Sequence, residues 1–93
     1  MLLEWDEAKN KTNRDKHGID FAEAHDFPWE DAVLADRSRH KDGEQRYAAT
    51  GWRHGRLYTV IFTRRGDALR IISFRRANSK EEKHHEENEI SEE

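Results

Sequence analysis

Residues 46–76 read RYAATGWRHGRLYTVIFTRRGDALRIISFRR, and this stretch decides the fold. It holds three runs rich in β-branched and aromatic residues, at 46–52, 56–64 and 69–76. The connections between the runs are short and contain Gly55 and Gly66, which is typical of hairpin turns. The pattern therefore predicts an antiparallel three-stranded meander over about 46–76.

Both faces of this meander are expected to carry apolar residues. Strict alternation along the strands gives one face Tyr58, Val60, Phe62, Ile72 and Phe74. It gives the other face Leu57, Ile61, Leu69 and Ile71. Because a sheet that is apolar on both faces needs cover on both, we expect helices to pack against it.

Helix signals flank the meander. Asp6 can cap a helix over about 6–17, which Gly18 would end. A capping-box spacing from Asp20 to Glu23 predicts a second helix over about 20–27, before Pro28.

The C-terminal part predicts a third helix over about 78–89, with Asn78 or Ser79 as its cap. Its acidic end, at 83–93, has little apolar surface to pack and is expected to fray. Short apolar runs at 2–5 and 32–35 indicate additional strands. The predicted fold class is α+β, as one domain over residues 1–93.

The composition limits the class of protein. Only 33% of the 93 residues are apolar and 40% are charged, but three Trp, four Phe and two Tyr can supply a small core. The absence of Cys excludes disulfides, thiol nucleophiles and thiolate metal sites. Without an apolar run of about 20 residues or a signal-peptide pattern, we expect a cytoplasmic protein with no membrane partner.

Charge is strongly segregated along the chain. Residues 1–36 hold four basic and ten acidic side chains, residues 37–79 hold eleven and three, and residues 80–93 hold two and seven. The basic middle segment could attract a polyanion such as RNA, or it could neutralise its acidic neighbours within one globule. Charge alone leaves both interpretations open.

The sequence contains no motif for a metal site or a nucleotide cofactor. None of the six His has the spacing of a metal site, and no glycine-rich phosphate loop or nucleophile elbow is present. The predicted strands instead carry or end in cations, namely Arg46, Arg56, Arg64, Arg70, Arg75 and Arg76. An Arg at the end of an apolar face needs an anion, which is either a carboxylate of the protein or a phosphate.

Several motifs occur in a fixed order along the chain. They are EWDxxK at 4–9, NxxKHGIxFxxA at 13–24, DGExR at 42–46, VxFTxRGD at 60–67 and RIISxRRA at 70–77, followed by Glu81. In this order and spacing, the chain resembles the BrnT family of type II toxin–antitoxin ribonucleases from Leu3 to about Glu81.

The resemblance implies a RelE-like fold and a toxin that cleaves RNA internally without a metal or other cofactor and thereby arrests translation. It also implies a cognate DNA-binding antitoxin of the BrnA type, encoded by a neighbouring gene, and complexes that pair two toxins with two antitoxins. A toxin dimer could also form alone.

Within this interpretation we predict a site built from cations and histidines. The predicted catalytic residues are Arg64, Arg75, His17 and His85, and the predicted RNA-binding residues are Lys9, Lys16, Arg46 and Arg76. The family usually has a Tyr near the position of His85, and this chain continues from there with acidic residues. The alternative is therefore a degenerate, non-catalytic module that acts through an antitoxin or a homodimer.

Overall fold

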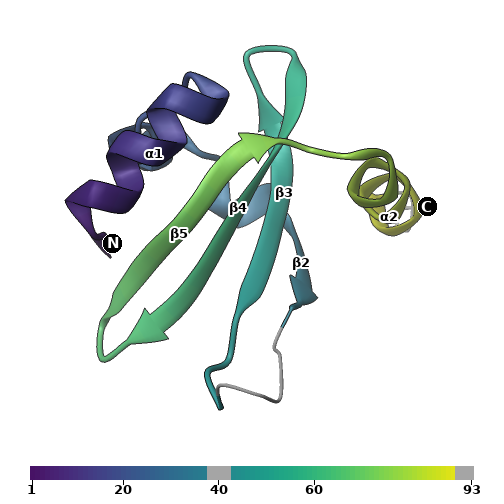
Figure 1. The fold of residues 1–93 in the computed structure, drawn as a ribbon. Coiled ribbons are helices and arrows are strands. Elements are labelled where there is room, and N and C mark those ends of the chain that lie inside the picture. The colour runs from purple at the N-terminus through teal and green to yellow at the C-terminus, as the bar shows by residue number, and fades with distance from the viewer. Residues whose placement is uncertain (38–42, 90–93) are drawn as a thin grey trace.

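The computed structural model describes residues 1–37 and 43–89 (Figure 1). Its elements in chain order are β1 (Leu2–Glu4), α1 (Glu7–His17), the 3₁₀ helices η1 (Phe21–Asp26) and η2 (Trp29–Asp31), β2 (Val33–Asp36), β3 (Tyr47–Arg53), β4 (Arg56–Arg65), β5 (Ala68–Arg76) and α2 (Ser79–Glu89). None of the helices described is long and apolar enough to cross a membrane.

The predicted meander is present as β3, β4 and β5, which pair antiparallel. The sheet is larger than the three-stranded meander, because the strands indicated at 2–5 and 32–35 are present as β1 and β2 and extend it to five strands in the order β1-β5-β4-β3-β2. It is also mixed, since β1 runs parallel to β5. No hairpin turn joins these two strands, so nothing in their connection imposes the antiparallel direction.

The helices differ from their predicted positions. Asp6 and Asn78 act as caps, so α1 and α2 begin one residue later than expected, and Asn78 exchanges capping-box hydrogen bonds with Glu81. The capping box of Asp20 is present, but the segment that follows is a 3₁₀ helix ending at Asp26 rather than a helix over 20–27. Its end precedes Pro28, which cannot donate a backbone hydrogen bond. Of the predicted frayed tail, residues 83–89 belong to α2 and residues 90–93 lie outside the described residues.

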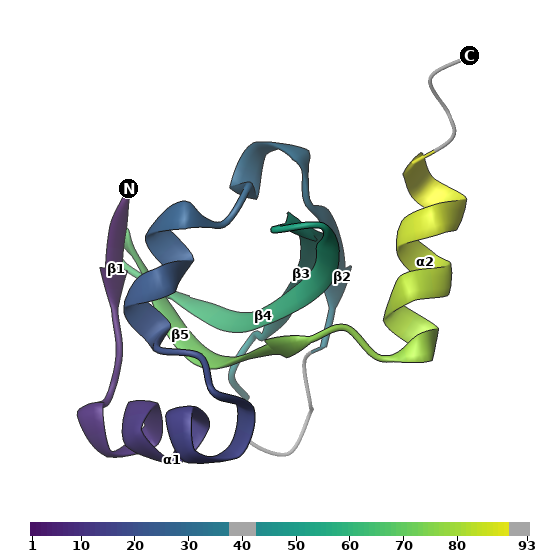
Figure 2. The same cartoon turned by 90° about the horizontal axis from the view of Figure 1, so that it is seen from above.

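The core lies between the concave face of the sheet and the two 3₁₀ helices (Figure 2). Its fully buried members come from η1, its flanks and the three central strands: Ile19, Phe21, Ala24, Phe27, Ala49, Val60, Phe62, Ile71 and Phe74. The opposite face of the sheet carries α2 beside β2 and β3, and α1 lies along β5.

A β-bulge changes the predicted faces of β5. Phe74 lies opposite Val60, but the register shifts so that Ile71, rather than Ile72, lies opposite Phe62. Ile71 is therefore in the core, and the prediction that placed Ile72 there is wrong. An inserted residue of this kind reverses the alternation on either side of it. The same shift turns Leu69 and Ile71 to the core face, while Arg75 lies opposite Thr59 on the far side of the sheet from the core.

Candidate functional site

A groove runs between α1 and the second half of β5. Lys9, Asn13 and Lys16 share one face of α1 because they are spaced by four and three residues, and this face borders Ile72 and Ser73 of β5. The groove has a volume of about 500 Å³ and is also lined by His17 at the end of the helix.

Asn13 holds α1 in this position. Its side-chain nitrogen donates to the carbonyls of Phe74 (2.8 Å) and Ile19 (3.0 Å), and its oxygen accepts from the backbone N–H of Phe74 (3.1 Å). These bonds satisfy the edge of β5 beyond the point where β1 stops pairing with it. The helix is thus attached to the strand that forms the other wall of the groove.

A second, smaller depression continues from the groove. It shares Lys9 and Ile72 with the groove and adds Arg46, Arg65 and Arg70. These cations are partly neutralised by protein carboxylates, since Glu44 lies 3.2 Å from Arg46 and 3.6 Å from Arg65, and Glu4 lies 2.9 Å from Arg70. The combined surface of the groove and the depression is therefore rich in cations, and protein carboxylates neutralise part of their charge.

His17 is the titratable group of the groove with a perturbed pKa. Although His17 is exposed, limited desolvation lowers the pKa of its imidazole below 6.5, and the positive charges of Lys16 and Arg75 lower it further. Both effects disfavour a protonated ring. At neutral pH the ring is therefore uncharged and able to accept a proton.

Arg75 is held by a buried carboxylate on α2. Its two terminal nitrogens donate to the two oxygens of Glu81, at 2.8 and 2.9 Å. Glu81, whose side chain is 7% exposed, also accepts from Thr59 (3.0 Å) and from the backbone of Asn78 (2.9 Å). Burial alone would raise the pKa of Glu81, but the hydrogen bonds from Arg75 and Asn78 outweigh it and hold that pKa below 4.5. Arg75 is thus fixed in orientation rather than free.

The structure brings together part of the predicted site. Lys9, Lys16 and His17 line the groove, Arg75 is close enough to affect the pKa of His17, and Arg46 lines the adjoining depression.

Arg64 is not part of this cluster. It lies opposite Leu69, which packs against the core, whereas Arg75 lies opposite Thr59 on the other face. Both cations were predicted to be catalytic, and the structure places them on opposite faces of the sheet.

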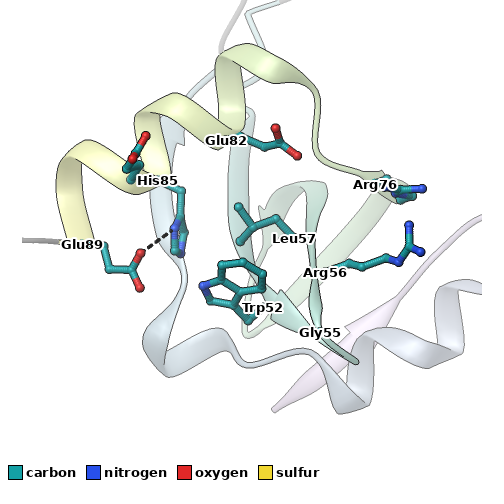
Figure 3. Close-up of a pocket in the computed structure, with 9 residues that line it drawn as sticks. Trp52, Gly55, Arg56, Leu57, Arg76, Glu82, His85 and Glu89 are labelled. Carbon is teal, nitrogen blue, oxygen red and sulfur yellow. Dashed lines mark ion pairs between the residues drawn. The ribbon is translucent and has the colours of Figure 1, made fainter.

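His85 and Arg76 line a third pocket, of about 540 Å³, between α2 and the β3–β4 hairpin (Figure 3). His85 is only 3% exposed, its Nδ1 lies 3.3 Å from Glu89, and its ring meets Trp52 edge-on at 6.1 Å. No residue of this pocket also lines the groove. His85 and His17 therefore belong to different surfaces.

The sequence prediction missed the two residues that position the site, Asn13 and Glu81. Both stand within the motifs quoted above, and Glu81 completes a capping-box spacing from Asn78. Their long-range partners, Phe74 and Arg75, carry no signal that sequence spacing could reveal. Within residues 1–37 and 43–89, no group of three His, Asp or Glu side chains is arranged to hold a metal ion.

Comparison with known proteins decides the family. Residues 5–81 match the family model described as the ribonuclease toxin BrnT of a type II toxin–antitoxin system. The chain belongs to the BrnT family. It is similar to the crystal structure of the ribonuclease toxin BrnT from Brucella abortus, with 34% sequence identity, a TM-score of 0.67, and coverage of 85% of this chain and 100% of the Brucella chain.

No protein with curated annotation matched the sequence significantly. The match to the BrnT toxins nevertheless covers α1, every strand of the sheet except β1, and the first turn of α2 up to Glu81. It therefore includes the groove and the Arg75–Glu81 pair.

Proposed function

We propose that this BrnT toxin is a metal-independent endoribonuclease that cleaves RNA by attack of a ribose 2′-hydroxyl on the adjacent phosphate. The observation that carries the proposal is the groove, in which a neutral His17 lies beside the cations of Lys9 and Lys16 and near Arg75. Family membership supports ribonuclease activity, and the groove supplies the groups that such cleavage needs without a metal.

Each group has a definite task in the proposed reaction. His17 accepts the proton of the 2′-hydroxyl, whose oxygen then bonds to phosphorus. The bond from phosphorus to the 5′-oxygen breaks, and the ammonium group of Lys9 or Lys16 protonates the leaving oxygen. Arg75, oriented by Glu81, stabilises the negative charge of the transition state. The products are a 2′,3′-cyclic phosphate and a free 5′-hydroxyl.

Arg64 and His85 have no part in this proposed step, because Arg64 lies on the opposite face of the sheet from Arg75 and His85 lines a separate pocket. Arg46 lines the adjoining depression and would hold the RNA backbone together with Lys9 and Lys16. Such contacts make binding weaken as salt concentration rises.

Inhibition of translation and neutralisation by a cognate DNA-binding antitoxin complete the proposal. Membership of a type II toxin–antitoxin family supports a protein partner of this class. One feature also favours the alternative of a binding module without catalysis. Leu34 on the edge strand β2 is 58% exposed. An edge strand with an exposed apolar side chain can pair with a strand of another chain. Light scattering of the isolated protein measures its oligomeric state and so tests whether the partner of β2 is a second copy of the same chain.

Incubation of the purified chain with labelled RNA in EDTA at low salt tests the enzyme proposal. We expect the chain to produce 2′,3′-cyclic ends, the His17→Ala variant to lose this activity, and the His25→Ala variant, which changes an exposed His on η1, to retain it. His17 is a cleaner test position than Arg75, since removing Arg75 would leave the buried Glu81 with only the more distant guanidinium of Arg37, at 3.5 Å.

The pH dependence gives a second readout of the same experiment. Because the pKa of His17 is lowered, its neutral form persists below pH 6.5, and the cleavage rate should fall only as the pH drops through that lowered value. Cleavage that EDTA abolishes would overturn metal independence. Cleavage that survives His17→Ala would overturn the role of His17.

A further inference from the structure

The pocket between α2 and the β3–β4 hairpin is unused by the proposed cleavage step. We call it the Trp52 pocket; it is lined by Trp52, Gly55, Arg56, Leu57, Arg76, Glu82, His85, Glu86 and Glu89. Its volume of about 540 Å³ is large enough for a nucleotide base, in the size range of small-ligand sites.

Trp52 provides an aromatic surface in this pocket. Its side chain is 52% exposed, which is unusual for so large an apolar group in a chain whose other aromatic residues pack on the core. His85 meets the indole edge-on, at an interplanar angle of 88°, and so supports its orientation. Exposed aromatic rings held in this way are the platforms on which single-stranded nucleic-acid bases stack.

Two guanidinium groups lie on one side of the pocket (Figure 3). Arg53, Arg70 and Arg75 each pair with a carboxylate. Arg56 and Arg76, by contrast, have no ion pair with any residue that the structure describes. Two guanidinium groups that lie on one side of a pocket and make no ion pair form a site for an anion, and a phosphate suits the guanidinium geometry.

Carboxylates from α2 line the other side. Glu82 and Glu86 are spaced by four residues and so share the helix face that borders the pocket, while Glu89 is engaged with His85. A phosphate would be repelled from this side, but a base with hydrogen-bond donors on its edge would not. Guanine presents two adjacent donors, N1–H and the N2 amino group, which match the two oxygens of one carboxylate.

We propose that the Trp52 pocket binds one guanine nucleotide of the RNA substrate. The base stacks on Trp52 and donates to Glu82 or Glu86, and its phosphate binds Arg56 and Arg76. The inference rests on the proposed ribonuclease function and adds a base preference to it.

The pocket and the groove share no lining residue, but both border β5. Ser73 borders the groove and Arg76 borders the pocket, so they are three residues apart, or about 10 Å along an extended strand. Neighbouring nucleotides of a single strand can span such a distance.

Binding of short 2′-O-methyl RNA oligonucleotides, measured by fluorescence anisotropy, tests the inference without any cleavage, since these strands have no free 2′-hydroxyl. One strand contains a single guanine and its matched strand has adenine there. We expect the guanine strand to bind about ten-fold tighter, Trp52→Ala to weaken its binding about ten-fold, and Trp52→Phe to restore most of it.

Glu82→Gln together with Glu86→Gln should abolish the preference for guanine, while Glu87→Gln, an exposed position on α2 that does not line the pocket, should leave it unchanged. Equal binding of the two strands by the wild-type chain, or no measurable binding of either, would overturn the inference. So would a Trp52→Ala variant that loses a protein partner but binds RNA normally.

These outcomes are separate from those of the cleavage test. Loss of cleavage in His17→Ala with no guanine preference would leave the ribonuclease proposal standing and reject the Trp52 pocket. A guanine preference without cleavage would support the Trp52 pocket and reject the ribonuclease proposal.

Discussion

The two α-helices have the same length, 11 residues each, and neither buries an apolar side chain. α1 instead buries Asn10 and Asn13, and α2 buries Glu81 and His85. The amides of α1 bind backbone groups and the carboxylate of Asp20, whereas the carboxylate of α2 binds the guanidinium of Arg75.

The difference shows two ways to attach a polar helix to a sheet. Neutral amides satisfy backbone groups that would otherwise be unpaired, so the attachment of α1 does not depend on a change of protonation. The attachment of α2 depends on two opposite charges, both of which must be ionised. Three changes test this distinction, and they are described below in order of decreasing effect.

Glu81→Ala should have the largest effect on stability. It leaves Arg75 without its carboxylate and removes the capping-box partner of Asn78, so we expect a loss of about 3 kcal/mol in the free energy of unfolding. Urea denaturation measures this loss, with Glu87→Ala on the exposed side of α2 as the control. Equal midpoints for the two variants would show that the buried pair does not hold the helix.

Asn13→Ala should cost about 2 kcal/mol, because it leaves both backbone groups of Phe74 without their side-chain partner in a buried region. Asn88→Ala, whose side chain bonds only to His84 of its own helix at an exposed position, is the matched control. A loss no larger than that of the control would contradict the anchoring role of Asn13.

The pH dependence of the free energy of unfolding is expected to distinguish the attachment of α2 from that of α1, with a smaller effect than the two substitutions above. Because the pKa of Glu81 is lower in the folded state than in the unfolded state, its ionised form adds stability that is fully present above about pH 4.5 and is lost as the pH falls through the lowered value. We expect Glu81→Gln to remove this part of the acid dependence.

The measurement is the free energy of unfolding from urea curves between pH 3 and pH 6. Asn13→Ala serves as the reference, since it should lower stability by the same amount at every pH in this range. A Glu81→Gln variant with an unchanged acid limb would contradict an ionic attachment of α2.

Local signals explain what the sequence could predict. Gly55 and Gly66 mark the turns of the meander, and both adopt the left-handed backbone conformation there. Asp6 and Asp20 mark helix starts, and the spacing of Lys9 and Lys16 places both on one face of α1. These features depend on residues close together in the chain.

Long-range pairing explains what was missed. The parallel contact of β1 with β5 joins Leu3 to Leu69, and no local pattern specifies it. The bulge was hidden because Ile71 and Ile72 are both apolar, so either could have faced the core. The bulge therefore turned Leu69 and Ile71 to the core face, while Ser73 and Arg75 stayed on the other face. Which anion holds Arg75 was left open by the sequence, and Glu81 is the answer in the structure.

The bulge at Ile72 also has a consequence for the descent of this domain. One extra residue in β5 allows Ile71 and Phe74 both to reach the core while Ser73 and Arg75 face the groove side. Loss of a single codon there would exchange the inward and outward positions over half the strand, without altering the turns or caps. Which side chains can meet a substrate on this face therefore depends on whether β5 has the extra residue, as much as on which cations the sequence contains. Two relatives with the same arginines could differ in whether those arginines meet a substrate.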